Sequence, residues 1–243
     1  MINIIFPVLN EKLRLESGIR RTVEYLQSIE YADYQITIVD NGSEDETPQI
    51  AERLCQEYPQ VRYEKIQIRG VGAAFRRGVK LNTCDIVGYM DIDLSTNIKH
   101  LGEAIELFQK DKDLQYINGS RFAKESDTKG RKWYRKITSQ GLLILLKLFL
   151  GMKCSDAICG FTFVRRQVAE ELVSASSQDN GWFYMIEFLL RAEKRGMKIL
   201  DYPVEWQEDY NTTVKLWKTI KNYLVQIVKL KRAFLKEDRK KHA

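Results

Sequence analysis

The fold class is decided by one short stretch of the chain, Asp85-Ile86-Val87-Gly88-Tyr89-Met90-Asp91-Ile92-Asp93. Residues 86–90 are apolar and β-favouring, which is typical of an interior strand of an α/β sheet. Asp91 and Asp93 follow directly, so two carboxylates lie at the carboxyl end of this strand. Ligands of open α/β sheets bind at that edge, and carboxylates there suit a hard divalent cation. An Asp-x-Asp pair by itself is more often a solvated turn, so the remaining sequence has to decide between the two interpretations.

The length and composition allow one large α/β domain, because 44% of the 243 residues are hydrophobic. The formal net charge is +6 and the isoelectric point is near 9.0. This balance is compatible with nucleic acid, an anionic membrane or a phosphorylated substrate, and it does not choose among them. The four cysteines and two histidines lack metal-ligand spacing, so we expect reduced thiols of a cytosolic protein and no zinc site.

The chain carries no recognisable export or membrane-spanning segment. Residues 1–7 lack a basic region and a small-residue cleavage site, so we expect a first strand there and a protein that is not exported. The longest apolar stretch, residues 142–150, is interrupted by Lys147 and is far shorter than the ~20 residues of a spanning helix. We therefore expect nothing that crosses a bilayer.

Strand and helix patterns alternate through the first hundred residues. Strands are predicted at residues 3–8, 35–40, 62–66 and 86–90, and helices at 13–28, 48–57 and 73–81. This repeat predicts a parallel sheet with right-handed crossovers, so the first half is Rossmann-like. The second half is less regular, as expected of the acceptor side of a cleft. Its predicted helices are at 97–110, 132–150, 182–195 and from about 214, and its predicted strands are at 114–118 and 198–202.

Two further turns fall at the same predicted sheet edge. Asp40 ends the second strand in the segment Val39-Asp40-Asn41-Gly42-Ser43, where a carboxylate can accept hydrogen bonds from a base or ribose. Arg69-Gly70-Val71-Gly72 precedes a predicted helix, so its glycines permit close backbone approach and the helix amino end favours an anion. Each motif alone is also compatible with an ordinary βα turn.

Together these motifs resemble the inverting family 2 glycosyltransferases of GT-A fold. Pro7-Val8-Leu9-Asn10-Glu11 is similar to that family's opening strand, residues 39–43 to its nucleotide-binding turn, and residues 91–93 to its metal-binding Asp-x-Asp. Downstream motifs resemble the narrower branch of dolichyl-phosphate and polyprenyl-phosphate glucosyl- and mannosyltransferases; they are residues 118–122, 156–161 and 202–206. The resemblance covers roughly residues 2–230. It implies an α/β GT-A catalytic domain over residues 1–212, with a Rossmann-like mixed sheet flanked by helices.

The resemblance also implies roles for particular residues. Asp91 and Asp93 would be catalytic and would hold Mg²⁺ or Mn²⁺, which neutralises the leaving nucleoside diphosphate. The donor-binding residues would be Pro7, Asn10, Glu11, Asp40, Gly70, Gly72 and Asp91. The acceptor phosphate would be held by Arg121, Arg135, Ser139 and Lys215, and guanidinium groups bind phosphate bidentately. A solvated basic loop is the alternative for the arginines.

Glu187 is a third catalytic candidate, although its segment departs from the family. Relatives carry Asp at the position of Met185, and that Asp is missing here. Glu187 could orient the sugar, act as a base or be a structural carboxylate. A phosphate monoester, with a second pKa of ~6, is already largely ionised at neutral pH and can attack without a protein base. Val71 and Thr162 also replace lysines that are usual in the family.

Four arginines are candidates to replace the two missing lysine cations. They are Arg69, Arg76, Arg165 and Arg166.

The last predicted helix is basic and amphipathic, within a C-terminal unit of residues 213–243. Residues 214–236 include seven basic and no acidic side chains, with apolar residues at helical spacing. Such a helix with Trp and Tyr suits an anionic membrane interface, and packing on the enzyme's own core is the alternative. Trp133-Tyr134 and residues 142–150 are a second candidate for lipid contact.

We therefore predict a metal-dependent, inverting glycosyltransferase that moves glucose from UDP-glucose, or another hexose, to a polyprenyl phosphate. It would be cytoplasmic and peripheral at the inner face of the membrane, without a nucleic-acid partner. One alternative is transfer to a hydroxyl of a glycan or glycolipid. The other is a basic binding module without catalysis, which the Asp91 and Asp93 pair disfavours. The sequence does not predict the oligomeric state.

Overall fold

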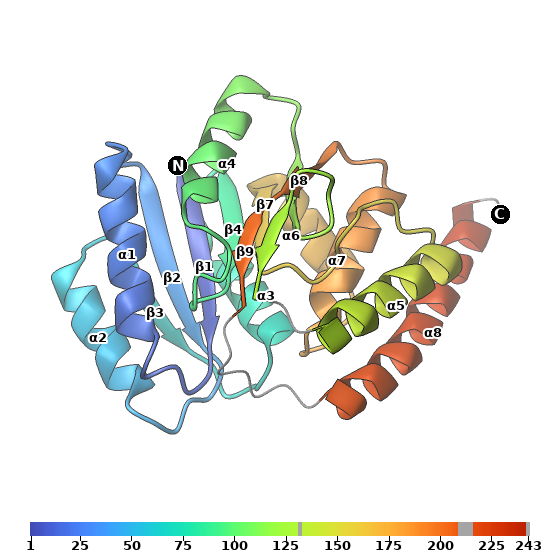
Figure 1. Cartoon of the computed structure of the whole chain (residues 1–243), viewed down its shortest axis with the longest axis horizontal. Helices are drawn as coiled ribbons and strands as arrows, with labels where there is room; N and C mark the ends of the chain where they lie inside the picture. The colour runs from blue at the N-terminus through green and yellow to red at the C-terminus, as the bar shows by residue number, and fades with distance from the viewer. Residues whose placement is uncertain (131–132, 209–215, 242–243) are drawn as a thin grey trace.

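A seven-stranded sheet with strand order β3-β2-β1-β4-β7-β5-β8 forms the centre of the fold (Figure 1). A computed structural model of the chain describes residues 1–130, 133–208 and 216–241. The strands of the large sheet are β1 (Ile2–Val8), β2 (Tyr34–Asp40), β3 (Val61–Lys65), β4 (Ile86–Met90), β5 (Tyr116–Ser120), β7 (Phe161–Arg165) and β8 (Ile199–Pro203). A second sheet pairs β6 (Asp127–Lys129) with β9 (Glu205–Gln207).

Helices cover both faces of the large sheet. They are α1 (Leu15–Ser28), α2 (Thr47–Glu57), α3 (Val71–Leu81), α4 (Lys99–Lys110), α5 (Trp133–Leu150), α6 (Arg166–Ala175), α7 (Phe183–Lys194) and α8 (Leu216–Lys241). Helices α1, α2 and α4 contribute to one apolar cluster, and α3, α6 and α7 contribute to another. Helices α5 and α8 pack on each other, away from β1, β2 and β3 (Figure 1).

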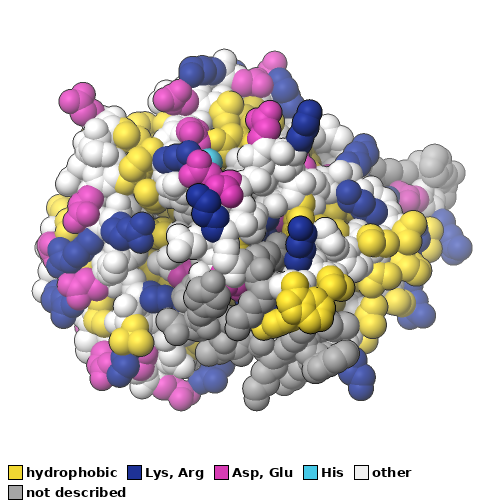
Figure 2. Space-filling model, in the orientation of Figure 1, with side chains coloured by type: hydrophobic (Ala, Val, Ile, Leu, Met, Phe, Trp, Pro, Cys, Tyr) yellow, Lys and Arg dark blue, Asp and Glu magenta, His cyan; other side chains and the backbone are white. Residues whose placement is uncertain are grey.

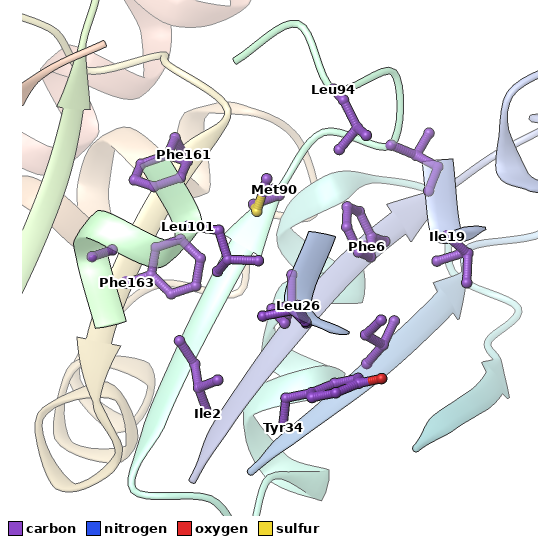
Figure 3. Close-up of a cluster of buried hydrophobic side chains, with 14 of the residues drawn as sticks. Ile2, Phe6, Ile19, Leu26, Tyr34, Met90, Leu94, Leu101, Phe161 and Phe163 are labelled. Atoms are coloured by element: carbon purple, nitrogen blue, oxygen red, sulfur yellow. The ribbon is translucent and has the colours of Figure 1, made fainter. Parts of the chain in front are cut away.

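The two apolar clusters explain why β1 is hydrophobic along its whole length. Ile4 and Phe6 belong to the first cluster, and Ile5 belongs to the second, because successive side chains of a strand point to opposite faces. Figure 3 shows Phe6 beside Leu26 of α1 and Leu101 of α4 in the first cluster. The strand is therefore buried on both faces, as the unbroken apolar run of a parallel sheet requires.

The first four strands confirm the expected parallel arrangement. Strand β1 pairs in parallel with β2 and with β4, and β2 pairs in parallel with β3. Strands β5 and β8 run in the same direction as β4, since both β4 and β5 are antiparallel to the intervening β7 and β8 is parallel to β5. The carboxyl ends of β1, β2, β3, β4, β5 and β8 therefore lie at one edge of the sheet.

Strand β7 and helix α6 are not among the predicted elements. In the antiparallel register, Phe161 at the start of β7 lies opposite Met90 at the end of β4. Strand β7 is short and largely buried, and it runs into α6 at Arg166 without an intervening turn. Because the junction contains no Gly, Pro or Asn, the sequence has no turn-forming residue that would mark the boundary between a strand and a helix there.

Helix α8 is joined to the rest of the fold by apolar packing. Its side chains Ile227, Leu230 and Phe234 are buried in the second apolar cluster. The predicted boundary between residues 212 and 213 lies outside the described residues. Among the described helices, none combines the length and the hydropathy that crossing a bilayer requires.

Gly88→Ala should destabilise the fold, because a Cβ atom at Gly88 of β4 would lie 2.0 Å from the Phe163 ring of β7. We expect a loss of about 1–3 kcal/mol in the free energy of unfolding, as for other overpacked cores. The matched control is Gly141→Ala in α5, where an added Cβ meets nothing within 4 Å. Urea denaturation should show the control unchanged or more stable, and equal stability of both variants would contradict this packing constraint.

Candidate active site

Asp91 and Asp93 lie at the carboxyl edge of the sheet, in a turn whose geometry is fixed by the backbone. The N–H of Asp91 donates to the Gly160 carbonyl at 3.3 Å, and the N–H of Leu94 donates to the Asp91 carbonyl at 3.1 Å. A Cβ atom at Gly160 would lie 1.8 Å from Asp91 Oδ2, so the carboxylate needs a glycine there. Asp93 Oδ1 accepts a hydrogen bond from the Ser95 N–H at 2.9 Å.

The charged form of Asp91 is destabilised by its surroundings. Burial, and then the neighbouring charge of Asp93, raise the pKa of Asp91 to about 7. The Tyr89 hydroxyl, which donates to Asp91 Oδ1 at 2.5 Å, and the nearby Arg121 cation oppose this rise. A hard divalent cation would relieve the repulsion and match the oxygen ligands, so the pair fits Mg²⁺ or Mn²⁺.

The described residues supply no further group of protein ligands around this pair. No cluster of three or more His, Cys, Asp or Glu side chains in the described part of the chain is placed to hold a metal ion. The remaining coordination positions would therefore be filled by water, by backbone oxygens or by a phosphorylated substrate. This open arrangement is suited to a metal that binds together with a substrate.

On the donor side, the loops after β1 and β2 are tied together. Asn10, with φ of +57°, accepts a hydrogen bond from the Glu44 N–H at 2.8 Å, and its own N–H donates to Ser43 Oγ at 2.9 Å. The Glu11 N–H donates to Thr47 Oγ1 at 2.8 Å. The predicted donor residues Asn10 and Glu11 are thus held beside the turn that follows Asp40.

Asp40 is buried and shapes its own turn. Its Oδ1 atom accepts hydrogen bonds from the Gly42 and Ser43 N–H groups at 3.1 and 2.7 Å. Its Oδ2 atom accepts from the Tyr63 hydroxyl at 2.9 Å, and burial together with this partner raises the pKa of Tyr63. Pro7 lies opposite Val39 in the register of β1 and β2, one residue before this point. Contact of Asp40 with a base or ribose stays a prediction.

Gly70 and Gly72 have a packing role that the sequence did not predict. A Cβ at Gly70 would lie 1.9 Å from the Asn180 carbonyl oxygen, and one at Gly72 would lie 2.5 Å from Tyr184 Cβ. The N–H of Gly72 donates to the same Asn180 carbonyl at 2.9 Å. The Gly72 N–H at this helix start is therefore bound by a carbonyl oxygen of the chain itself. Contact of either glycine with a donor stays a prediction.

On the acceptor side, Arg121 follows β5 at the same sheet edge. Its Nε and Nη2 atoms donate to the two carboxylate oxygens of the buried Asp156 at 2.7 and 3.0 Å. Burial would lower the pKa of Arg121, but Asp156 outweighs burial and raises it. The guanidinium lies 5.4 Å from the centroid of the Trp206 ring in β9, a cation–π contact.

Arg135 lies against the same side of β9 as Arg121. Its Nη1 atom donates to Glu208 Oε1 at 2.7 Å. Glu208 directly follows β9, and its N–H donates to the Lys129 carbonyl of β6 and so extends the pairing of the two strands. Glu208 and Trp206 are two residues apart in extended chain and share a face. One face of β9 therefore supports both predicted acceptor arginines.

The two other predicted acceptor residues have different outcomes. Ser139 is buried on α5, four residues after Arg135, so the two lie on one side of that helix. Lys215 lies outside the described residues.

Glu187 is buried in a structural network on α7. Its carboxylate accepts hydrogen bonds from the Ser177 N–H at 2.9 Å and from Arg191 Nε at 2.7 Å, and also from the Ser177 hydroxyl. The side chains of Glu187 and Arg191 are 3% and 5% exposed. This geometry favours the structural interpretation of Glu187, and a role as a catalytic base stays a prediction.

Two of the four arginines proposed to replace missing cations are at the wrong edge of the sheet. Arg165 pairs with Ile86 at the amino end of β4, and Arg166 follows it. Arg76 donates to Asp179 and Asn180 in the loop before α7. Arg69 remains at the donor edge, where it pairs with Glu44.

The positions of the missing aspartate, at Met185, and of one missing lysine, at Val71, lie in the same part of the structure. Met185 is buried in the second apolar cluster, and Val71 packs against that cluster. Two charges that the family resemblance leads us to expect are thus replaced by apolar side chains of one cluster.

Sequence reasoning missed Tyr89 and Glu208 as residues of the site. Tyr89 precedes Asp91 by two residues, so the strand periodicity places both on one side, and this signal was present. Glu208 follows β9 beyond the motif at residues 202–206, and nothing in its sequence context marks it.

Comparison with known proteins places these features in one family. Residues 3–173 match the family described as Glycosyl transferase family 2. Glycosyltransferase AglD of Haloferax volcanii is 32% identical over 94% of this chain and 36% of its own length. Dolichyl-phosphate beta-glucosyltransferase ALG5D of Trichomonas vaginalis is 28% identical over 90% of this chain and 70% of its own. Dolichol-phosphate mannosyltransferase of Pyrococcus furiosus is 27% identical over 94% of this chain and 63% of its own.

Solved structures share the fold at lower sequence identity. Glucosyl-3-phosphoglycerate synthase from Mycobacterium tuberculosis, in complex with Mn²⁺, UDP-glucose and phosphoglyceric acid, has a TM-score of 0.68 and 18% identity. The alignment covers 95% of this chain and 79% of that one. This chain spans little more than a third of the Haloferax protein, 36%. The chain belongs to glycosyl transferase family 2, and its mixed α/β sheet flanked by helices is of the GT-A type.

Proposed function

We propose that this chain transfers a hexose from a nucleotide-sugar to a polyprenyl phosphate with inversion, with glucose from UDP-glucose as the expected donor. The observation that carries the proposal is the placement of Arg121 and Arg135 on one face of β9. Arg121 is also near enough to Asp91 to oppose the rise in the pKa of that carboxyl. The relatives named as dolichyl-phosphate glucosyltransferase and dolichol-phosphate mannosyltransferase support this acceptor class.

Asp91 and Asp93 would hold Mg²⁺ or Mn²⁺ in this reaction. The bound ion would neutralise the charge that develops on the leaving nucleoside diphosphate. Tyr89 binds Oδ1 of Asp91, and Ser95 orients Asp93. Structural neighbours described with Mn²⁺ and UDP-glucose, or with Mg²⁺ and UDP, support this choice of metal.

A phosphate acceptor suits the groups that are placed near the pair. Arg135 uses one guanidinium nitrogen for Glu208 and its side chain is 28% exposed, so other N–H groups can meet a phosphate. An ionised phosphate needs no protein base. A hydroxyl acceptor does need one, and Glu187 is already bound by Ser177 and Arg191. We therefore favour the phosphate over the hydroxyl alternative.

The outer faces of α5 and α8 support a place at a membrane surface. Hydrophobic side chains gather over α5 (Figure 2), and among them Trp133, Ile137, Ile144 and Leu148 are exposed at helical spacing. Helix α8 exposes Leu224, Val225 and Val228 among lysines. We place these faces against anionic lipid at the inner, cytoplasmic surface. Since α5 also bears Arg135, the prenyl chain and its phosphate would meet the same helix.

Metal binding should change the pH dependence of stability. The folded pKa of Asp91, about 7, exceeds its ordinary value of 3.8, so the metal-free fold binds more protons than the unfolded chain between these values. Stability from this group is therefore lost as pH rises toward 7. Mn²⁺ should restore this stability. Asp93→Asn should reduce both effects, because burial alone still raises the pKa of Asp91, as measured by urea denaturation near pH 5.5 and pH 7.5. An unchanged pH profile in Asp93→Asn would contradict the coupling of the two carboxylates.

A donor and acceptor screen tests the proposed reaction directly. Purified protein should transfer glucose from UDP-glucose to undecaprenyl phosphate but not to undecaprenol, because the alcohol lacks the charge that the arginines bind. GDP-mannose is the competing donor. Asp93→Ala and EDTA should each abolish transfer, and transfer to the alcohol instead would favour the hydroxyl alternative.

Arg135 should act on the acceptor and not on the donor. Arg135→Ala alone would leave Glu208 buried without its partner, so the test uses Arg135→Ala with Glu208→Gln, compared with Glu208→Gln alone. We expect the KM for polyprenyl phosphate to rise about tenfold or more, since a hydrogen bond to a charged group is worth about 1.5–3 kcal/mol. The KM for the donor should stay unchanged, and equal acceptor KM values would remove Arg135 from the phosphate site.

Binding to anionic vesicles should depend on the basic face of α8. Changing Lys221, Lys229 and Lys236 to Glu should weaken co-sedimentation with phosphatidylglycerol vesicles at least tenfold, because each basic side chain near such a surface contributes about 1 kcal/mol. High salt should also weaken vesicle binding by the wild-type protein, because salt screens the attraction between lysines and anionic lipid.

The matched control reverses the same number of charges far from α8. In it, Arg21 on α1, Lys110 at the end of α4 and Lys112 just after α4 are changed to Glu. Circular dichroism should report an intact fold in both proteins. If the α8 variant sediments like the control, α8 serves core packing and not lipid binding.

A further inference from the structure

The loop of residues 176–182, which joins α6 to α7, closes the amino end of α3. The Asn180 carbonyl accepts the Gly72 N–H at 2.9 Å, and Arg76 of α3 donates to the Asn180 side chain at 2.6 Å. The same arginine lies over the Tyr184 ring, with 4.8 Å to its centroid. The start of α3 is therefore held from outside by this loop.

The start of α3 is held from the other side by the donor edge of the sheet. The Gly70 N–H donates to Asn41 Oδ1 at 3.0 Å, and Asn41 Nδ2 donates to the Val8 carbonyl at 2.8 Å. Asn41 directly follows Asp40 in the predicted nucleotide-binding turn. A shift of the 176–182 loop would thus move Gly70 against that turn.

Glu187 holds the 176–182 loop at its beginning. Its carboxylate accepts both the N–H and the hydroxyl of Ser177. The remaining partner of Glu187 is Arg191, one turn along α7, at 2.7 Å. The interactions of this buried carboxylate are therefore directed at the loop and at its own helix.

Helix α8 contacts this loop directly through Gln226 and contacts α7, which carries Glu187, through Glu237. Gln226 Nε2 donates to Asp179 Oδ2 at 2.8 Å. Glu237 accepts from Arg191 Nη1 at 2.8 Å, and the Arg191 guanidinium lies 5.4 Å from the Phe234 ring centroid. The side chain of Glu237 is 40% exposed, so a change there reaches the loop only through Arg191 and Glu187.

We propose that Glu187 is a positioning residue for the donor and not a base, and that α8 is part of the same support. Glu187 and Gln226 hold the 176–182 loop, and the loop fixes the amino end of α3 beside the nucleotide-binding turn. This inference rests on the proposed function for the identity of the donor. It assigns to α8 an effect on donor binding that is independent of any lipid contact.

Three single variants in the full-length protein test the proposal: Glu187→Gln, Gln226→Ala and Glu237→Gln. Calorimetry with UDP-glucose and Mn²⁺ should show Kd raised about three- to thirtyfold, the range of other indirect couplings. The KM for polyprenyl phosphate should stay within about twofold, since coupling through the loop does not reach the acceptor arginines. A base would behave differently: Glu187→Gln would lower kcat about 10²–10⁴-fold at unchanged donor Kd, and the α8 variants would be silent.

Matched controls remove similar groups that do not touch the loop. Asn222→Ala deletes an exposed amide one turn earlier on α8, and Glu171→Gln on α6 breaks an exposed ion pair with Arg195, which directly follows α7. Both should bind the donor as the wild-type protein does. Wild-type donor affinity in Gln226→Ala and Glu237→Gln would overturn the proposal.

Amide hydrogen exchange separates this inference from the proposed function. Peptides covering residues 70–75 should exchange faster in the three variants than in the controls, with no ligand present, because the Gly72 N–H loses its fixed acceptor. If the wild-type protein binds no nucleotide-sugar but exchange still accelerates, the proposed function fails and the loop support stands. Unchanged exchange in all three variants refutes the support itself.

Discussion

The site depends on the close approach between the Asp91 carboxylate and the backbone of Gly160. Strand β7 runs antiparallel between β4 and β5, and this reversal brings the chain before Phe161 to the end of β4. The carboxylate then lies beside Asp93 with little water around it, which raises the pKa of Asp91. The fold thus keeps two like charges together at the edge where six strands end, a state that a divalent cation stabilises.

Two supports flank this pair and use different physical means. On the acceptor side, the buried Arg121–Asp156 ion pair and the Trp206 ring fix the direction of a cation. On the donor side, backbone groups of the 176–182 loop meet Gly70 and Gly72 so closely that no side chain fits. Charge therefore orients one half of the site, and steric contact orients the other half.

Much of the fold could be predicted because the first half repeats strand and helix with strong periodicity. Asp40 and Asp91 could be placed at one edge because parallel strands share their direction, whereas Arg121 was assigned to the acceptor only by resemblance. The hydrogen-bond and ion-pair partners of the site residues could not be predicted. Asp156 meets Arg121, and Glu208 meets Arg135, only through pairings of distant segments. Strand β7 was missed because its sequence runs into α6 without a turn. The packing of Gly70 against Asn180 could not be predicted either, since a glycine that binds a donor and a glycine that packs against a carbonyl look alike in the sequence.

Helix α5 carries Arg135 and Ser139 on an inner side and exposed apolar side chains outside. Trp133 and Leu148 are fifteen residues apart on that outer side, about 22 Å of helix. A helix that rests lengthwise on lipid would open the acceptor site toward the plane of the bilayer. Acceptor and product would then exchange by lateral diffusion in two dimensions, and the nucleotide would exchange with the aqueous phase. Each substrate would have its own route, so product departure need not wait for the nucleotide.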